Sequence, residues 1–263
     1  MSASILNTID HTITKWIYDN IGKNKNPLIS KAPYYLGLLP YELYVLPGMF
    51  LAIFVMFYDK TFHPVQFHLL PHWFAYSMAT YIKHNVDRIR PGCIKENEMN
   101  KLIDPKHCIG GTKHQSFPSG HTIIAVALAT TLRMYLLDDT YKAEDKTFLG
   151  IPFYDPMIQT ATICFGFFVA FMISIHRMSY GYHNFSDVLV GALLGYAIGF
   201  SIYLISNLFK MDADEKIKEE KKEEENGTTK EWHGIQIAGM VLSGIAFMHF
   251  FVYRFNDLAK IQH

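Results

Sequence analysis

The sequence predicts an all-α fold: a polytopic membrane bundle of about six transmembrane helices, with an amphipathic N-terminal helix at the membrane surface. Half of the 263 residues are hydrophobic, and the polar residues gather in a few blocks separated by long uncharged runs. A bilayer core about 30 Å thick requires roughly 20 apolar residues of helix, and six runs approach or reach that length. Such a chain has too little polar surface to cover six buried helices in water.

The predicted spans and the segments around them divide the chain into four parts. Residues 36–209 form the membrane core, between an N-terminal interfacial segment (1–35) and a Lys/Glu-rich loop (210–233); residues 234–263 hold the last span and a C-terminal tail. The first five spans fall at about residues 43–58, 61–82, 122–137, 157–175 and 188–209, and the sixth at 234–253. The second span is the least certain to be transmembrane by its sequence, because it contains three histidines and two prolines.

Two periodic patterns refine this picture. Isoleucine occupies every fourth position over residues 5–21, which is typical of an amphipathic helix that lies in the membrane interface. The fifth span carries Gly191, Gly195 and Gly199 on one helical face. Small residues at this spacing let a neighbouring helix backbone approach closely.

Composition and topology narrow the class of protein. Lys and Arg total 24, and Asp and Glu also total 24, so the chain lacks the positive excess that a nucleic-acid partner requires. Three cysteines cannot form a disulfide scaffold, although they allow one bridge. Six spans place both termini and the loops after spans two and four on one side of the membrane. Lys and Arg are spread almost evenly over the two sides, so charge bias does not orient the chain.

Three polar clusters fall on that same side. In chain order they are Lys83-His-Asn-Val-Asp-Arg-Ile-Arg90-Pro91, Pro118-Ser119-Gly120-His121 and Arg177-Met-Ser-Tyr-Gly-Tyr-His183-Asn-Phe-Ser-Asp187. Taken singly, each cluster has an ordinary interpretation: juxtamembrane positive charge, a helix start and a capping interaction. Because all three clusters lie on the same side of the membrane, we expect them to form a single site.

The cations and the helix start predict that this site binds an anion. The planar guanidinium groups of Arg90 and Arg177 match phosphate oxygens, and Lys83 adds a point charge. Ser119 and Gly120 precede a helix whose free N–H groups favour an anion, and glycine lets the backbone come close to it.

The two histidines predict the reaction. His183 and Asp187 are four residues apart at a helix start and share one face. A carboxylate there can keep one ring nitrogen protonated and leave the other as a nucleophile, and His121 can protonate a leaving oxygen. These parts predict phosphoryl transfer through a phosphohistidine. We expect no cofactor and no metal ion, because no cluster offers a convincing metal site.

The three clusters are similar to the signature of the type 2 phosphatidic acid phosphatase superfamily, and the resemblance covers about residues 83–187. It implies a metal-independent phosphatase whose site residues can be assigned position by position. The phosphate-binding residues would be Lys83, Arg90, Ser119, Gly120 and Arg177, and the catalytic residues His183 (nucleophile), His121 (acid) and Asp187 (orienting carboxylate).

The chain departs from the family pattern in two places. His176 stands where the family usually has serine before the third-cluster arginine. Because histidine can still donate to a phosphate oxygen, we expect activity with altered affinity or pH dependence. Only two clear spans precede the first cluster, which is more similar to the glucose-6-phosphatase group than to many lipid phosphate phosphatases. The chain is too short for the additional C-terminal spans of that group.

Family analogy also predicts the compartment of the site. The active site would be lumenal or extracytoplasmic, in the endoplasmic reticulum or another endomembrane. Cys93 and Cys108 lie in a loop on that side, where an oxidising environment would allow a bridge; two free thiols fit the sequence equally well. Asn226-Gly227-Thr228 falls on the opposite side, so we expect this glycosylation acceptor to be unmodified.

We therefore expect an integral-membrane phosphatase that hydrolyses a lipid phosphate or a polyprenyl diphosphate while the lipid tail stays in the bilayer. The alternatives are a sugar-phosphate phosphatase of the glucose-6-phosphatase type, a lipid phosphotransferase, vanadate-dependent halide oxidation and a catalytically silent lipid-binding membrane protein. The sequence predicts no oligomeric state.

Overall fold

The computed structural model describes residues 3–43, 68–94, 98–108, 115–137, 147–148, 151–152 and 155–224. Most of the predicted first span, the first part of the second and all of the sixth lie outside the described residues. The expectations about Asn226 and the end of the Lys/Glu-rich loop lie outside them as well.

Four long helices form the body of the described chain. They are α4 (Leu70–Asn85), α5 (Gly120–Leu137), α6 (Pro156–Ser179) and α7 (Phe185–Glu224). Helices α5, α6 and the first half of α7 are long and apolar enough to cross a membrane, and they correspond to predicted spans three, four and five. The all-α class is confirmed; of the six predicted spans, these three are the candidates found among the described residues.

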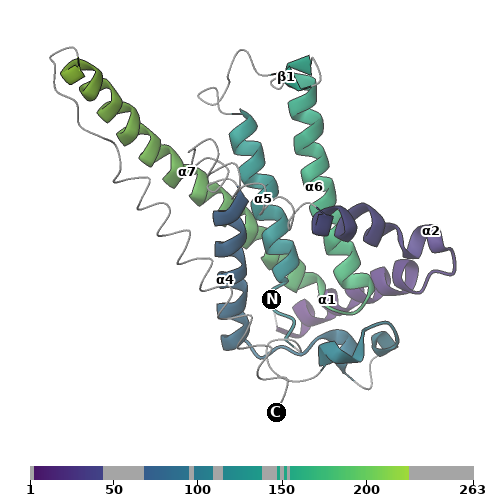
Figure 1. Ribbon diagram of the computed structural model, residues 1–263. Coiled ribbons are helices and arrows are strands. Elements are labelled where there is room, and N and C mark those ends of the chain that lie inside the picture. The colour runs from purple at the N-terminus through teal and green to yellow at the C-terminus, as the bar shows by residue number, and fades with distance from the viewer. Residues whose placement is uncertain are drawn as a thin grey trace.

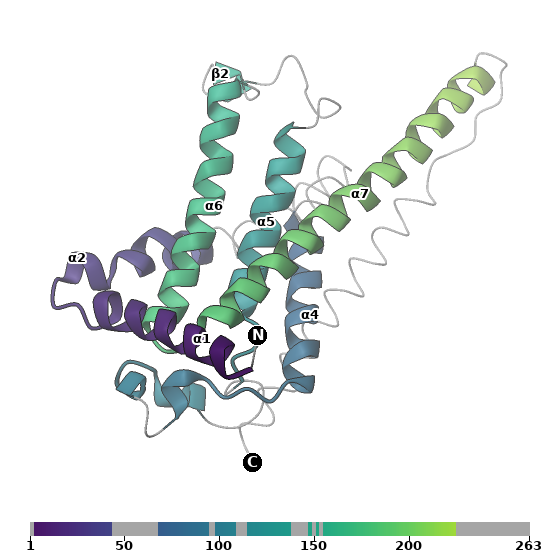
Figure 2. The same cartoon turned by 180° about the vertical axis from the view of Figure 1, so that it is seen from behind.

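The helices alternate in direction, which brings four helix ends to one level. Figures 1 and 2 show α4, α5 and α6 running side by side, with α7 inclined across them. The carboxyl ends of α4 and α6 lie at the same end of the bundle as the amino ends of α5 and α7. All three polar clusters of the sequence are at these four ends.

The N-terminal segment lies across that end of the bundle. It comprises α1 (Ala3–Ile17), the π-helical turn η1 (Tyr18–Gly22), the short helix α2 (Pro27–Ser30) and a second π-helical turn, η2 (Tyr34–Leu38). Part of the isoleucine stripe packs on protein: Ile17 is buried and, together with Ile13 and Ile21, contacts the end of α6 and the start of α7. Trp16, on another face, is 61% exposed.

The connections are short or irregular. After α4, the polar segment forms three 3-10 turns, η4 (Pro91–Cys93), η5 (Glu98–Lys101) and η6 (Pro105–Cys108). At the opposite end of the bundle, β1 (Thr147–Phe148) pairs antiparallel with β2 (Ile151–Pro152) between α5 and α6.

Local sequence explains where the helices begin and how far they extend. The Asp155 side chain accepts hydrogen bonds from the backbone N–H groups of Met157 and Ile158, and Pro156 occupies the first turn of α6, a common helix start. Helix α7 continues through the Lys/Glu run to Glu224, because Lys and Glu are good helix formers. The first part of the predicted loop 210–233 is therefore helical.

The predicted glycine stripe is confirmed as a packing surface between α7 and α5. A methyl group at Gly195 would overlap the carbonyl of Ile123, and one at Gly199 would lie 2.6 Å from the carbonyl oxygen of Ala127. The backbones of the two helices therefore touch, and this contact fixes the start of α7 beside the start of α5.

Replacing Gly195 by alanine should force α7 away from α5. Overpacking of this kind costs about 1–3 kcal/mol, so we expect a lower midpoint of thermal unfolding in detergent. Gly166→Ala is the matched control, because a methyl group there would meet Ala129 at an ordinary 3.5 Å. Equal unfolding midpoints for the two variants would show that the close contact is not needed.

Candidate active site

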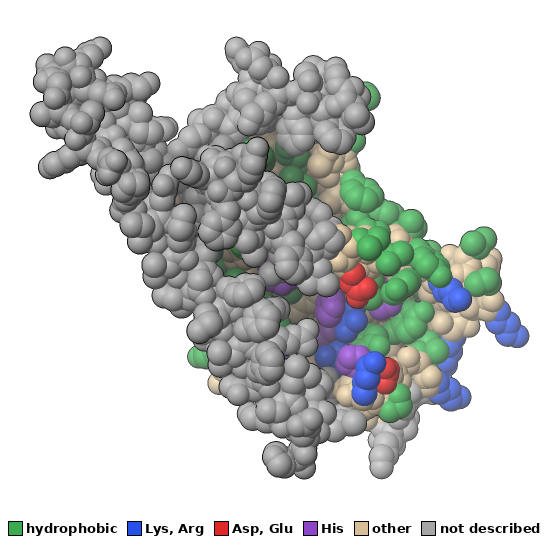
Figure 3. Space-filling view, viewed as in Figure 1, with side chains coloured by type: hydrophobic (Ala, Val, Ile, Leu, Met, Phe, Trp, Pro, Cys, Tyr) green, Lys and Arg blue, Asp and Glu red, His purple; other side chains and the backbone are tan. Residues whose placement is uncertain are grey.

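The three sequence clusters meet at the end of the bundle where the four helices converge. Lys83 is in the last turn of α4, Arg90 follows it, His121 is in the first turn of α5, and Arg177 is near the end of α6. His121 interacts electrostatically with His183 and with all three cations. Figure 3 shows histidine and Lys/Arg side chains gathered at one place in the lower half of the molecule, beside a hydrophobic surface.

An aromatic ring arranges two of the cations. The guanidinium of Arg177 lies 3.9 Å from the ring centre of Tyr182, and that of Arg90 lies 5.6 Å from it. Arg90 also donates to the carbonyl oxygen of Tyr182, at 3.4 Å. Both arginines are buried, and Nε of Arg177 has no hydrogen-bond partner in the described part of the chain. A buried donor of this kind suits an anionic ligand.

Tyr182 is a site residue that the sequence motifs do not predict. Its only signal in the sequence is its position between Arg177, a predicted phosphate-binding residue, and His183, the predicted nucleophile. Aromatic rings hold guanidinium groups by cation–π attraction without neutralising them, so Tyr182 fixes the arginines and leaves their charge available.

Burial and mutual repulsion lower the pKa values of the basic groups in this site. Desolvation, together with the charges of Arg90 and Arg177, lowers the pKa of Lys83 to about 7. Desolvation lowers the pKa of Arg90 to about 10. Desolvation and the three cations hold the pKa of His183 well below its usual range. The His183 ring is therefore neutral at pH 7, as a nucleophile must be.

His183 and Asp187 face each other in a fully buried position. His183 Nδ1 lies 3.7 Å from Asp187 Oδ2, which is an ion-pair distance but longer than a hydrogen bond. The same carboxylate oxygen accepts the backbone N–H of Asn184 at 2.7 Å. The predicted pair is thus in place, with its carboxylate oriented by the start of α7.

Ser119 and Gly120 differ from expectation in one respect. The backbone N–H of Ser119, expected to be free for an anion, donates to the carbonyl of Asp187 at 3.0 Å, because the starts of α5 and α7 touch. The Ser119 hydroxyl is buried and hydrogen-bonded to the hydroxyl of Thr122 at 2.9 Å. Among the described residues, a methyl group at Gly120 would meet Ala79 at 3.6 Å, an ordinary van der Waals contact.

His176 lies in an aromatic cluster. Its buried ring is 4.7 Å from that of Tyr180 and 6.0 Å from that of Tyr34, between ring centres. It also stacks with Tyr182 at 6.5 Å. His176 thus reaches the site through Tyr182, the residue that holds the arginines.

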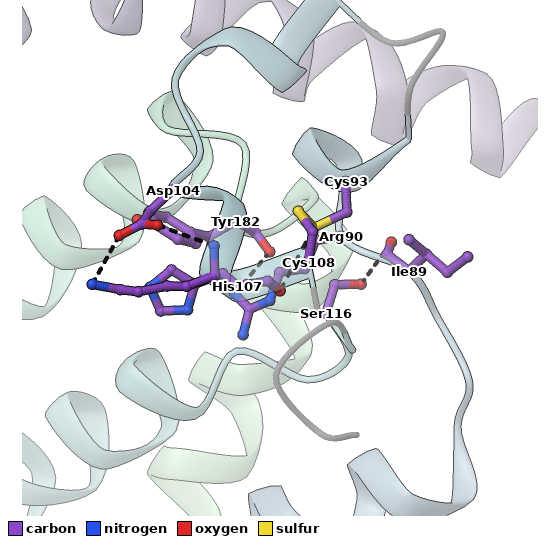
Figure 4. The surroundings of a disulfide bond; sticks show 9 residues. Ile89, Arg90, Cys93, Asp104, His107, Cys108, Ser116 and Tyr182 are labelled. Atoms are coloured by element: carbon purple, nitrogen blue, oxygen red, sulfur yellow. Dashed lines mark hydrogen bonds and ion pairs between the residues drawn. A yellow bond between two sulfur atoms is a disulfide. The ribbon is translucent and has the colours of Figure 1, made fainter. Parts of the chain in front are cut away.

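A disulfide closes the polar loop beside these residues. Cys93 and Cys108 are bonded, and Figure 4 shows the bridge next to Arg90 and Tyr182. The ring of His107 packs edge-on against Tyr182, with 5.1 Å between ring centres. The bridged loop therefore supports the aromatic ring through His107.

The described residues contain no group of three or more His, Cys, Asp and Glu side chains that could hold a metal ion. The convergent groups of the site are cations and imidazoles, which suit a phosphate.

A helical bundle with this site defines a class of membrane protein, and comparison with known proteins identifies it. Residues 68–210, more than half of the chain, match the family model of the PAP2 superfamily, and the chain belongs to this superfamily. It is 24% identical over 162 residues to a PA-phosphatase related-family protein of Dictyostelium discoideum, covering 60% of this chain and 56% of that protein's length.

A solved structure shares the fold. The crystal structure of a transmembrane PAP2 type phosphatidylglycerolphosphate phosphatase from Bacillus subtilis superposes with a TM-score of 0.56 at 19% identity. The match covers 78% of this chain and 88% of that one. The fold likeness and the apolar helices indicate a multi-pass membrane protein.

Replacing Tyr182 by leucine should weaken phosphate binding. Each cation–π contact is worth about 0.5–2 kcal/mol, so we expect the inhibition constant of inorganic phosphate to rise about two- to thirtyfold. Tyr182→Phe, which keeps the ring, should retain most of the affinity. A Tyr182→Leu protein with wild-type phosphate affinity would show that the ring does not arrange the arginines.

The charge of Lys83 should make substrate binding depend on pH. Lysine is protonated below its pKa, so the empty site loses this positive charge as pH rises through about 7, and KM should increase above that pH. In Lys83→Arg the charge persists to much higher pH, and the increase should be smaller. Measuring both proteins with one substrate cancels the ionisation of the substrate itself; identical profiles would contradict this role of Lys83.

Proposed function

We propose that this protein is an integral-membrane phosphatase that removes phosphate from a lipid phosphate or a polyprenyl diphosphate, through a phosphohistidine and without a metal ion. The convergence of two histidines and three cations from separate segments carries the proposal. Membership of the PAP2 superfamily supports it.

In the first step, His183 attacks phosphorus. Its Nδ1 faces Asp187, so the lone pair on Nε2 is the nucleophile. The N–P bond forms as the bond from phosphorus to the alcohol or phosphate leaving oxygen breaks, and His121 gives a proton to that oxygen. Catalytic hydrogen bonds often shorten only as the transition state forms, and this applies to the 3.7 Å His183–Asp187 distance.

In the second step, water releases the phosphate. His121, now neutral, takes a proton from the water as the water oxygen bonds to phosphorus and the N–P bond breaks. Lys83, Arg90 and Arg177 stabilise the charge on the phosphoryl oxygens in both steps.

The surface around the site supports a lipid substrate. The N-terminal segment beside the site exposes large apolar side chains, among them Trp16 (61%), Leu28 (80%) and Tyr35 (54%). Exposed apolar and aromatic groups of this kind suit the membrane interface, where a lipid head group can reach the site while its tail stays in the bilayer. The Bacillus subtilis protein of similar fold is a phosphatase of a lipid phosphate.

The disulfide supports a lumenal or extracytoplasmic active site. Disulfides persist in oxidising compartments, and the Cys93–Cys108 bridge lies in the loop next to Arg90. An endomembrane location with the site in the lumen satisfies this condition.

Replacing His183 by alanine should abolish phosphate release from the preferred substrate, because no nucleophile remains. The measurement is phosphate release in detergent micelles from phosphatidic acid, phosphatidylglycerolphosphate, a polyprenyl diphosphate and glucose 6-phosphate. Wild-type protein given a substrate with labelled phosphate should form an acid-labile phosphoenzyme, and His183→Ala should not.

His11→Ala, at an exposed position on α1, is the control and should keep wild-type turnover. Full turnover by His183→Ala would exclude the phosphohistidine. Preference for glucose 6-phosphate over every lipid would exclude the lipid substrate class.

A further inference from the structure

A chain of charged side chains runs from α1 to the His183–Asp187 pair. Arg88 donates through Nη1 to Asp187 Oδ1 at 2.7 Å and to the Ser186 hydroxyl at 2.6 Å. Through Nη2 it donates to Oδ2 of Asp10 on α1. One guanidinium therefore joins the start of α7 to Asp10, which lies 78 positions before Arg88 in the sequence.

Arg88 both compensates and orients Asp187. The Asp187 side chain is fully buried, and an isolated buried carboxylate is strongly unfavourable. Arg88 binds one of its oxygens, which turns the other oxygen toward His183. A carboxyl group fixed at one oxygen cannot rotate away from the imidazole that it faces.

Helix α1 also caps the helix that carries Asp187. The first N–H groups of a helix have no partner within it, and they are usually satisfied by the helix's own N-cap residue. Here α1 supplies two of the partners: the N–H of Phe185 donates to the Thr14 hydroxyl at 2.9 Å, and the N–H of Ser186 donates to Asp10 at 2.7 Å. The negative charge of Asp10 is favourable at this positive helix end.

We propose that Asp10 and Arg88 are positioning residues for phosphoryl transfer, so that the N-terminal helix is part of the catalytic machinery. Arg88 sets the charge and rotation of Asp187, Asp10 fixes Arg88 and the first turn of α7, and Asp187 in turn aims His183. This inference rests on the proposed function, and neither residue needs to contact the phosphate.

The first test separates positioning from phosphate binding. Misplacing a reactive group by about 1 Å can cost about 100-fold in rate, so Arg88→Ala should lower kcat by about 10- to 100-fold. KM should stay near the wild-type value, because the three phosphate-binding cations remain. Arg88→Lys keeps a charge but cannot bind both carboxylates, so it should restore kcat only in part.

Asp10→Asn gives a milder, independent variant. Its side-chain oxygen can still accept the Ser186 N–H, but its ion pair with Arg88 is lost, so kcat should fall by less than in Arg88→Ala. Asp19→Asn is the matched control, because it removes an aspartate that is paired with Lys15 and Lys23 in the same N-terminal segment. This control should keep wild-type kcat and KM.

A second readout needs no turnover. Vanadate can accept a fifth ligand from a correctly placed imidazole nitrogen, whereas inorganic phosphate depends on the cations alone. In thermal-shift titrations of the full chain, Arg88→Ala should lose at least tenfold in vanadate affinity and keep its phosphate affinity. Asp19→Asn should change neither affinity.

Each outcome decides between the alternatives. Unchanged kcat and vanadate affinity in Arg88→Ala would overturn the inference, and so would a raised KM with unchanged kcat. If Arg88→Ala is unstable, Arg88→Lys and Asp10→Asn decide by the same criteria. If the wild-type protein binds vanadate more tightly than inorganic phosphate but releases no phosphate from any substrate, the proposed function alone is overturned. The vanadate affinities of wild type and Arg88→Ala would then still test the inference. Wild-type protein with no preference for vanadate would overturn both.

Discussion

Buried positive charge at one end of the bundle is the constraint on which the site depends. Like charges in a poorly solvated place repel one another, and their removal from water is unfavourable. Lys83 shows this directly, since burial together with Arg90 and Arg177 brings its pKa to about 7. Binding of an anion offsets the repulsion, so the arrangement favours a phosphate before any specific contact is counted.

The protein keeps this charge available by pairing its carboxylates elsewhere. Asp187 is close enough to act on Lys83, yet its Oδ1 is bound by Arg88, which also binds Asp10. Tyr182 holds Arg90 and Arg177 with its ring, which carries no negative charge. One group of residues, Arg88 with Asp10 and Asp187, thus pairs opposite charges. The neighbouring group, Tyr182 with Arg90 and Arg177, holds its positive charge against an aromatic ring.

Hydropathy and spacing were sufficient to predict much of the fold. The apolar runs at 122–137, 157–175 and 188–209 lie within α5, α6 and α7, because a span must be predominantly apolar along its length. The glycine spacing predicted the contact of α7 with α5, since only small residues allow it. Helix ends were less accurate: α7 runs on to Glu224 because backbone hydrogen bonds continue where the side chains become polar.

The candidate site was predictable only in part. Its motif residues come together because they lie at helix ends on one side, which follows from the topology. The partners of Arg88 could not be predicted from the topology, because a single sequence contains no signal that relates Arg88 to Asp10, 78 residues before it. The isoleucine stripe was ambiguous for another reason: an apolar helix face has the same pattern whether it meets lipid or protein.

That ambiguity has a structural resolution in α1, which has faces of different kinds. Ile17 packs against the end of α6 and the start of α7, Asp10 and Thr14 bind the first N–H groups of α7, and Trp16 points outward. If α1 left this place, the first turn of α7 would lose two hydrogen-bond partners, and Arg88 would lose one of its two carboxylates. The geometry around His183 therefore depends on the same helix that exposes Trp16.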